Sequence, residues 1–362
     1  MKILVLEPYY GGSHKTFLDG LLAHVPLDFF LLTLPARSWK CRMRLAAPFF
    51  AGRIAELLSK EKFDAVLCSS FVDVATLRAL LPRAVNRLPF FTYFHENQFV
   101  YPVRREDERD FHFGLTNLTS VLASDKVAFN SRYNMETFFT GVERIVKVCP
   151  DMQFKNIVET IRLKSSVHYP GIDFRNIDAV TRAERKKNDS PVIIWNHRWE
   201  HDKNPKLFFE TLIRLDRQDI DFQLILLGQS FRTIPPVFAE ALEKLKHRII
   251  HCGFVKTGEE YARLLHSGDV VVSTSSHEFY GISVIEAVRA GCYPLLPARL
   301  SYTELFPAEF LYNDDEYVSR LQLILQKRCG LDSVRAKSLT ERYSWEHLKQ
   351  RYLDWFCTVS NC

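Results

Sequence analysis

Two glutamates separated by eight positions mark what the sequence indicates to be a strand-to-helix turn. Glu278 follows an apolar strand predicted over 269–273 and a short polar turn, and Glu286 lies within a helix that Gly281 opens. The first N–H groups of a helix lack partners inside it, and the helix dipole favours an anion there. Carboxylates accept hydrogen bonds from vicinal hydroxyls, so this pattern favours a sugar nucleotide. The alternative is an ordinary strand–helix connection with a solvated glutamate.

Two cations lie in a predicted loop that follows the strand over 191–195, in the second half of the chain. They are Arg198 and Lys203. Fixed cations can neutralise a departing diphosphate, whose charge grows as a glycosidic bond breaks. Arg suits forked contact with phosphate and Lys acts as a point charge. With these cations present and no D-x-D pair placed to hold a metal, we expect no metal and no cofactor. Solvated surface charge is the alternative.

Polar residues also follow two predicted strands of the first half, over 2–6 and 89–94. In parallel sheets such positions lie at the carboxyl edge, where open α/β sheets bind ligands. No G-x-G-x-x-G is present, so a nicotinamide cofactor is not expected. The residues to which we assign a ligand role are Gly12, Ser13, His14, Lys15, His95, Glu96 and Asn97.

The segment 36–44 combines four cations with a tryptophan and is predicted to be a loop ahead of a helix near 49–60. These residues are Arg37, Trp39, Lys40, Arg42 and Arg44. Basic side chains beside an aromatic ring suit a nucleic-acid backbone and an unstacked base. Residues 1–170 hold 22 Lys+Arg against 17 Asp+Glu (+5), and the remainder holds 26 of each, which accounts for the totals of 48 and 43. A polyanionic partner is therefore predicted for the first half; the alternative is a solvated basic loop with a packed Trp.

The composition indicates a globular protein of two domains. The 362 residues are 47% hydrophobic and 25% charged, which excludes a disordered chain. No apolar run reaches the roughly 20 residues that span a bilayer, and Glu7 interrupts any signal-like run. The 8 Cys lack C-x-x-C or zinc-like spacing, which favours reduced thiols. We therefore expect a cytoplasmic protein without a membrane partner.

Strands alternate with helices twice along the chain, with a polar segment between the two series. This predicts an α/β fold of two Rossmann-like, doubly wound parallel-sheet domains facing each other across a cleft. The predicted boundaries are 1–170 for the first, acceptor-binding domain, 171–190 for a linker, 191–344 for the nucleotide-sugar domain and 345–362 for a C-terminal helix.

The E-x7-E pattern together with the Arg198 and Lys203 pair resembles the retaining family 4 glycosyltransferases, which have the GT-B fold. The resemblance implies that Glu278 binds donor-sugar hydroxyls, Glu286 binds the ribose, and the two cations neutralise the diphosphate. His95 matches a donor-sugar contact and joins Arg198, Lys203 and Glu278 as a catalytic candidate. The further donor-binding residues are Gly12, Gly253, Phe279, Tyr280 and Gly281. The last helix is expected to cross back onto the first domain.

Three N-terminal segments, 7–15, 94–98 and 129–134, look like the tRNA-queuosine α-mannosyltransferases. Such enzymes transfer mannose from GDP-mannose to the cyclopentene hydroxyl of queuosine in the anticodon of tRNA-Asp. The implied acceptor-binding residues are Ser13, His14, Lys15, Arg37, Trp39, Lys40, Arg42, Arg44, Glu96 and Asn97. One departure from many family 4 members is Glu96-Asn97 after the histidine, where His-Asp is common. Two alternatives stay open: a small-molecule, lipid or glycan acceptor, and a non-catalytic nucleotide-sugar or RNA-binding module.

Overall fold

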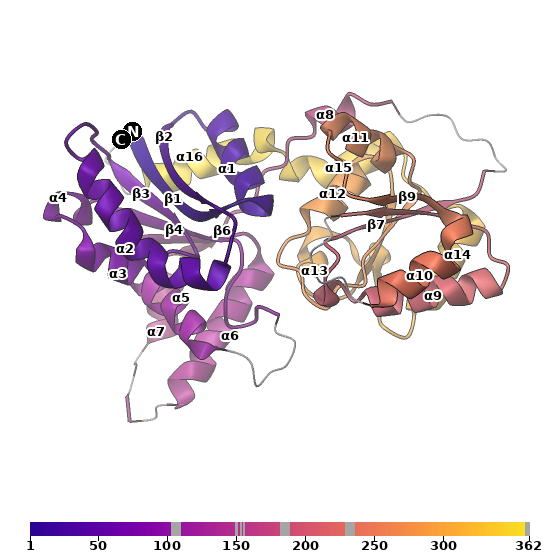
Figure 1. Cartoon of the computed structure of the whole chain (residues 1–362), viewed down its shortest axis with the longest axis horizontal. Coiled ribbons are helices and arrows are strands. Elements are labelled where there is room, and N and C mark those ends of the chain that lie inside the picture. Colours follow the sequence, from indigo (N-terminus) through magenta and orange to yellow (C-terminus); the bar gives the residue numbers. More distant parts are fainter. Residues whose placement is uncertain are drawn as a thin grey trace. The chain divides into compact units, whose positions relative to one another are not determined.

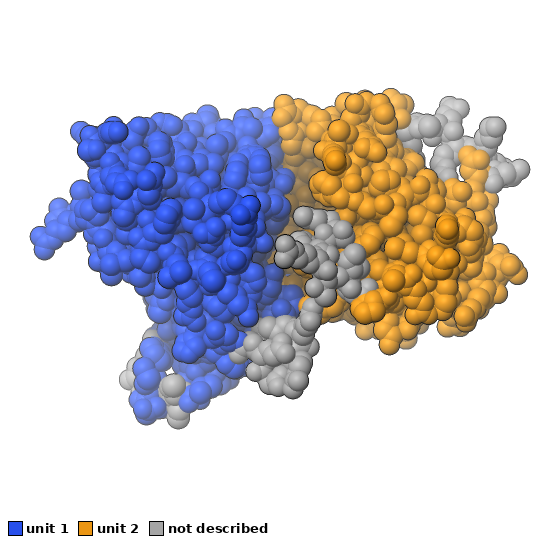
Figure 2. Space-filling view, viewed as in Figure 1, with its two compact units in different colours: residues 1–171, 345–362 blue, residues 172–344 orange. Residues whose placement is uncertain are grey.

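The computed structural model describes residues 1–102, 110–148, 151–152, 154, 156–181, 189–228 and 236–358. It divides the chain into two compact units, which Figure 2 shows in different colours. Unit 1 comprises Met1–Gly171 and Trp345–Cys362, and unit 2 comprises Ile172–Ser344. Each unit contains one six-stranded sheet.

The sheet of unit 1 is parallel, with the strand order β2-β1-β3-β4-β5-β6. Its strands are β1 (Lys2–Tyr10), β2 (Asp28–Pro35), β3 (Ala65–Ser69), β4 (Phe90–Phe94), β5 (Lys126–Phe129) and β6 (Ser165–Val167). The chain moves from β1 outward to β2 and then returns past β1 to β3. The direction of winding therefore reverses between β1 and β3, the place where doubly wound sheets bind ligands.

Helices cover both faces of this sheet because successive residues of a buried strand point to opposite sides. Ile3 and Val5 pack in a cluster with α1 and α16, whereas Leu4 and Leu6 pack in another with α2 and α3. Figure 1 labels these elements. The helices of unit 1 are α1 (Gly12–His24), α2 (Trp39–Leu57), α3 (Val74–Leu80), α4 (Arg83–Asn86), α5 (Phe111–Ala123), α6 (Arg132–Val148), α7 (Ile157–Arg162) and α16 (Trp345–Cys357).

Helix α2 begins ten residues earlier than the sequence predicted, at Trp39 instead of Phe49. Residues 39–44 of the basic segment therefore belong to a helix, and the prediction of a loop was wrong for them, whereas residues 36–38 precede the helix. Pro48 misled the prediction, because proline favours a helix start over a helix interior. The apolar positions Met43, Ala47 and Phe50 are buried at helical spacing and carry the helix through the proline.

Helix α16 packs within unit 1, where its first residue, Trp345, fills a space left by two glycines. A Cβ atom on Gly20 of α1 would lie 2.1 Å from the Trp345 Nε1, and one on Gly171 would lie 2.2 Å from its Cδ2. Trp345 also stacks against His24 and contacts Phe17. The C-terminal end of the chain therefore completes the core of unit 1 (Figure 1).

The sheet of unit 2 is also parallel, with the order β12-β11-β10-β7-β8-β9. Its strands are β7 (Val192–Asn196), β8 (Gln223–Leu227), β9 (Ile249–Gly253), β10 (Val270–Val272), β11 (Tyr293–Pro297) and β12 (Leu311–Tyr312). Here the winding reverses between β7 and β10. Because both sheets are doubly wound, the predicted fold class of two Rossmann-like α/β domains is confirmed.

Helices of unit 2 pack on both faces of its sheet. Ile193, Trp195 and Leu224 enter a large aromatic and aliphatic core with α9, α10 and α14. On the other face, Ile194 lies against Gly268 and Cys292 near α11 and α12. The helices are α8 (Arg175–Asp178), η2 (His201–Lys203), α9 (Pro205–Arg217), α10 (Val237–Lys244), η3 (Lys246–Arg248), α11 (Gly258–His266), α12 (Ile282–Arg289), α13 (Tyr302–Leu305), η4 (Ala308–Phe310), α14 (Tyr317–Lys327), α15 (Ser333–Thr340) and η5 (Glu341–Tyr343).

The predicted linker over 171–190 is partly a folded element of unit 2. Ile177 of α8 is buried, and Asp178 forms an ion pair with Arg289 of α12 at 2.6 Å. These contacts attach the segment to α12, so its beginning was wrongly predicted as a linker. Its basic residues 182–187 lie outside the described residues. Within the described part of the chain, no helix is long and apolar enough to cross a membrane.

Substitutions at two helical glycines should separate close packing from helix propensity. Gly20→Ala forces a methyl group into Trp345, so we expect the free energy of unfolding to fall by about 1–3 kcal/mol. Gly52→Ala in α2 meets open space and should raise the free energy of unfolding by about 0.5–1 kcal/mol, because alanine favours helix. Urea unfolding of both variants gives the measurement. Equal gains in stability would contradict the close approach of α1 and α16.

Candidate functional site

A buried lysine at the end of the short helix η2, which follows β7, lies between two carboxylates. The Lys203 ammonium is 3.2 Å from Asp202 Oδ2 and 3.2 Å from Glu278 Oε2, and it donates a hydrogen bond of 2.7 Å to the His277 carbonyl. Lys203 is 5% exposed. Sequence reasoning had placed Lys203 and Glu278 in one site, and the structure brings them into direct contact.

The electrostatics of this group keep all three members charged. Burial favours the neutral form of Lys203, but Glu278 and Asp202 outweigh it and raise the pKa of the ammonium. Burial likewise opposes ionisation of Glu278, yet Lys203 lowers the pKa of that carboxyl below its usual value. The nearby imidazole of His197 responds in the opposite sense, since burial and the Lys203 charge lower its pKa to about 4. The site therefore holds one ammonium and two carboxylates beside a neutral imidazole.

Arg198 lies beside this group and is half exposed. Its guanidinium is 3.1 Å from Glu200 Oε2. Burial opposes ionisation of Asp202, but the charges of Lys203 and, to a smaller extent, Arg198 outweigh it and lower the pKa of that carboxyl. The site thus has one half-exposed guanidinium next to one buried ammonium. That combination suits an anionic group arriving from solvent.

One serine anchors the turn that carries Glu278. Ser301 donates hydrogen bonds to the carbonyl oxygens of Tyr280 (2.9 Å) and Glu278 (3.3 Å). Phe279 and Tyr280 are buried and pack internally, and Gly281 adopts φ +106° immediately before α12. A left-handed residue at this position favours glycine, which explains the Gly between the two glutamates.

The second glutamate, Glu286, is held by a tyrosine that sequence reasoning missed. Tyr261 of α11 donates a hydrogen bond of 2.7 Å to Glu286 Oε2, and the Asn196 amide donates one of 2.7 Å to the Tyr261 oxygen. Asn196 ends β7, and Ser283 of α12 bonds its carbonyl. Burial raises the pKa of Glu286 from 4.5 to about 7, against the effect of Tyr261. Its charge therefore changes close to neutral pH.

Gly253 lies apart from these residues in the sheet order. It ends β9, which is separated from β7 by β8, and it has φ +129° with open space where a Cβ would stand. A cavity of about 460 Å³ lies between α9 and α10 and contains none of the predicted site residues. The candidate site therefore rests on the polar contacts at the carboxyl ends of β7 and β10, not on that cavity.

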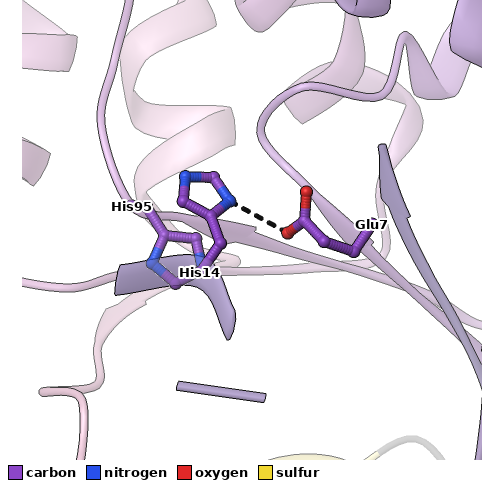
Figure 3. Close-up of side chains that lie close together, drawn as sticks. All are labelled: Glu7, His14 and His95. Atoms are coloured by element: carbon purple, nitrogen blue, oxygen red, sulfur yellow. Dashed lines mark hydrogen bonds and ion pairs between the residues drawn. The ribbon is translucent and has the colours of Figure 1, made fainter. Parts of the chain in front are cut away.

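Unit 1 has a buried histidine clamped by two carboxylates at the equivalent edge of its sheet. His14 Nδ1 is 2.9 Å from Glu7 Oε2, and its Nε2 is 3.3 Å from Glu96 Oε2 (Figure 3 draws the first contact). Burial would lower the pKa of His14, but Glu7 and Glu96 outweigh it and raise the pKa to about 10. Ser69, the last residue of β3, donates a hydrogen bond to Glu7, and the next residue, Ser70, donates one to Glu96. The clamp is therefore an imidazolium between two anions.

His95 stacks on His14 with ring centroids 4.0 Å apart (Figure 3). Burial, followed by the His14 charge, lowers the pKa of His95 well below its usual value, so this ring is neutral. One ligand atom from each of Glu7, His14 and His95 lies within 4.8 Å of the others, a spacing open to a metal ion. However, both nitrogens of His14 already face carboxylates. Because the rings of His14 and His95 are stacked, their nitrogen lone pairs lie in nearly parallel planes and do not converge on one point. The arrangement fits a proton on His14 better than a metal.

The remaining residues predicted around this edge have different environments. Gly12 has φ +52° at the start of α1, Ser13 is exposed, and exposed Lys15 forms an ion pair with Asp19. Asn97 is fully buried, and its amide donates to Asn134 and Thr137. An amide bound internally in this way gives Asn97 a structural role, and the structure does not support its predicted contact with an acceptor.

The basic residues at the start of α2 surround an aromatic cluster. Trp39 is half-buried and contacts Phe71, Tyr101 and Phe113, with ring centroids 5.3–6.2 Å apart. The Arg44 guanidinium lies 4.8 Å from the centre of the Phe113 ring. Arg37 and Lys40 are exposed, and Arg42 is half-buried. The structure thus keeps the predicted combination of cations and aromatic rings, with Arg37 before the helix and the other cations on it.

Four functional candidates were absent from the sequence prediction. They are Glu7, Asn196, Asp202 and Tyr261. Glu7 carried a usable signal, since a carboxylate inside an otherwise apolar strand is costly unless it is paired. Tyr261 carried none, because its partner Glu286 is 25 residues away and only the packing of α11 beside α12 joins them.

Removal of the Lys203 charge should destabilise unit 2. In Lys203→Ala, two buried carboxylates lose their shared cation, so we expect the free energy of unfolding to fall by about 3–5 kcal/mol. Lys244→Ala on α10 breaks the exposed ion pair with Glu240 and should change the free energy of unfolding by less than about 0.5 kcal/mol. Chemical denaturation measures both. A similar small change in each variant would mean that Lys203 is not the cation on which the site depends.

Comparisons with known proteins identify the family of the chain. Residues 2–172 match the family described as tRNA-queuosine alpha-mannosyltransferase N-terminal, and residues 176–310 match glycosyl transferases group 1. The tRNA-queuosine alpha-mannosyltransferase of Drosophila melanogaster is 36% identical over 98% of this chain and 96% of its own. The GDP-mannose:cellobiosyl-diphosphopolyprenol alpha-mannosyltransferase of Xanthomonas oryzae is 24% identical over 45% of this chain and 46% of its own.

Solved structures extend the likeness of fold to the whole chain. Anabaena HepE in complex with UDP has a TM-score of 0.70 at 13% identity, covering 99% of this chain and 100% of its own. Sucrose-phosphate synthase of Thermosynechococcus elongatus has a TM-score of 0.69 at 16% identity, covering 98% of each chain. The fold is that of GT-B glycosyltransferases, and the predicted resemblance is confirmed. This chain is a glycosyltransferase and belongs to the tRNA-queuosine alpha-mannosyltransferase family.

Proposed function

We propose that this enzyme transfers mannose from GDP-mannose to the cyclopentene hydroxyl of queuosine in the anticodon of tRNA-Asp, in the cytoplasm. The observation that carries the proposal is the relationship over 98% of the chain to a tRNA-queuosine alpha-mannosyltransferase. A relationship of that extent includes both units, the donor-type site of unit 2 and the polar edge of unit 1. The partial relatives whose names specify GDP-mannose support the same donor.

The donor binds to unit 2 in this proposal. Lys203 and Arg198 balance the diphosphate, and the N-terminus of α12 adds unpaired N–H groups. Glu278, fixed by Lys203, accepts hydrogen bonds from the sugar, and Glu286 accepts them from the ribose. No metal or cofactor is required, because the two cations supply the charge.

Mannose is transferred with retention of the anomeric configuration. A retaining hydrolase uses one carboxylate as a covalent nucleophile about 5 Å from a second. Here the Glu278 carboxylate is occupied by Lys203 and serves in binding. The acceptor oxygen therefore attacks from the face that the diphosphate leaves, and the departing phosphate takes its proton. The bond from sugar to phosphate breaks as the bond to the acceptor oxygen forms.

The acceptor binds to unit 1. Arg37, Lys40 and Arg44 contact tRNA phosphates, and Trp39 offers a partly exposed ring for an unstacked base. The His14–Glu96 pair lies close by at the edge of the sheet, since His14 contacts Phe71, which in turn contacts Trp39. Because His95 stacks on His14, acceptor hydroxyls bound at this pair lie beside the neutral ring of His95.

A transfer assay tests the function directly. Incubation with GDP-mannose should add one hexose to the queuosine nucleoside of tRNA-Asp, measured by mass spectrometry of digested tRNA, and add none to tRNA lacking queuosine. The same gain should persist in EDTA, because the cations of the site are side chains. Transfer to a lipid, glycan or small molecule instead would favour a glycosyltransferase with a different acceptor. Donor binding without any transfer would favour a non-catalytic module.

Loss of the half-exposed cation should slow the chemical step. For Arg198→Ala we expect kcat to fall by about 100-fold or more, the scale of removing one group that stabilises developing charge. Lys206→Ala is the control, since that exposed residue of α9 pairs with Glu210 outside the site. Initial rates at saturating donor and acceptor provide the comparison. Turnover equal to that of the unmodified enzyme would remove Arg198 from the mechanism.

The donor affinity should depend on pH through Glu286. With its pKa raised to about 7, this carboxyl is about one-tenth ionised at pH 6 and nine-tenths at pH 8. Ribose hydroxyls donate to the ionised form, so GDP should bind about tenfold more tightly at pH 8, as measured by calorimetry. Glu286→Gln keeps the shape of the side chain and should lose this difference, while any titration of the phosphates themselves remains. Identical profiles for the two proteins would contradict the assignment.

A further inference from the structure

The polar cluster of unit 1 has an unbalanced negative charge. Glu7 and Glu96 each contribute a carboxylate, His14 contributes one positive charge, and His95 is neutral. Among the described residues, His14 is the only basic partner of either carboxylate. Buried charge without compensation is unfavourable, so this edge of the sheet favours a cation when a ligand binds.

Glu96 is the carboxylate that a ligand can reach. Its side chain is 12% exposed, whereas that of Glu7 is 1% exposed. Among the described residues, the one contact to its Oε1 is a long one of 3.4 Å from the Ser70 hydroxyl, so that oxygen retains capacity to accept. His95 is 94% buried (6% exposed) and its ring has no hydrogen-bond partner among the described residues. A polar ring in that state, stacked on His14, points to a ligand at the same place (Figure 3).

We propose that Glu96, held by His14, binds a cationic amine of the acceptor next to the hydroxyl that receives the sugar. This inference rests on the proposed function and names the group by which the acceptor is selected. Queuosine joins its cyclopentene diol to the base through a secondary amine, which is protonated at neutral pH. An ammonium paired with Glu96 would make the cluster neutral and fix the attached ring. The hydroxyls of that ring then lie beside the unpaired nitrogen atoms of His95.

The aromatic rings next to the cluster fit the base of the same nucleoside. Tyr9 and Phe71 contact His14, with ring centroids 5.9 Å and 5.2 Å away, and Phe71 contacts Trp39 at 6.2 Å. Tyr9 and Trp39 are partly exposed. Stacking on such rings is how proteins bind unstacked bases in RNA. The carboxylate and the rings together suit a nucleoside that has a cationic side arm.

The charge of the acceptor can be tested by combining enzyme and substrate changes. Acceptors are queuosine tRNA-Asp and the same tRNA with the amine nitrogen replaced by carbon. The unmodified enzyme should have a KM for the carbon analogue about 10- to 100-fold higher, the worth of a charge-assisted hydrogen bond. Glu96→Gln should raise the KM for natural tRNA by a similar factor and cause little further loss with the analogue. Glu96→Asp, which keeps the charge, should still discriminate.

Controls separate this role from folding and from the function itself. GDP affinity should be unchanged in Glu96→Gln, and Glu56→Gln on the exposed side of α2 should behave as the unmodified enzyme. Equal KM values of the unmodified enzyme for the two acceptors would overturn the inference while leaving the proposed function intact. An equal loss in Glu96→Gln on both acceptors would also overturn it. Absence of transfer to any queuosine tRNA would remove both. Zinc binding that Glu7→Gln abolishes would identify a metal site at Glu7, His14 and His95 instead.

Discussion

The shared cation of Lys203 is the interaction on which the donor-type site depends. It joins Asp202, from the segment after β7, to Glu278, from the segment after β10. Without that charge, two buried carboxylates from different parts of the chain would repel each other and the turn before α12 would lose its anchor. The ammonium stays protonated because these carboxylates raise its pKa more than burial lowers it. One ion therefore fixes both the fold of the turn and the orientation of the Glu278 carboxylate.

The two units use the same physical device at the same topological place. In each, a buried cation lies between two carboxylates where the winding of a parallel sheet reverses: Lys203 at β7 and β10, and His14 at β1 and β3. The neighbours differ. Unit 2 adds the half-exposed charge of Arg198, which suits an anion, whereas the unit 1 cluster has no further cation among its described contacts. The unit 2 site therefore has a half-exposed cation that the described contacts of the unit 1 cluster lack.

Packing far from these edges supports them indirectly. Alternating residues of β1 enter two separate clusters, so the strand is fixed on both faces and the place of Glu7 along it is set. Helix α16 contributes Trp345 to one of these clusters. In unit 2, Tyr261 reaches Glu286 because α11 packs beside α12. A helix that contains no predicted site residue therefore sets the hydrogen bonding of one that does.

The sequence by itself determined the two α/β series, the fold class and, through the resemblance of short motifs, the family, because strand periodicity, turn residues and short motifs are local properties. It also placed Lys203 with Glu278, since both follow parallel strands. It erred over α2, where the local effect of Pro48 competes with buried Met43 and Phe50. Only the tertiary structure decided that Glu7 and Glu96 clamp His14, that Asn97 is internal, and that Tyr261 binds Glu286. Those relations depend on burial and on contacts between distant segments, which set charge states and which no local pattern encodes.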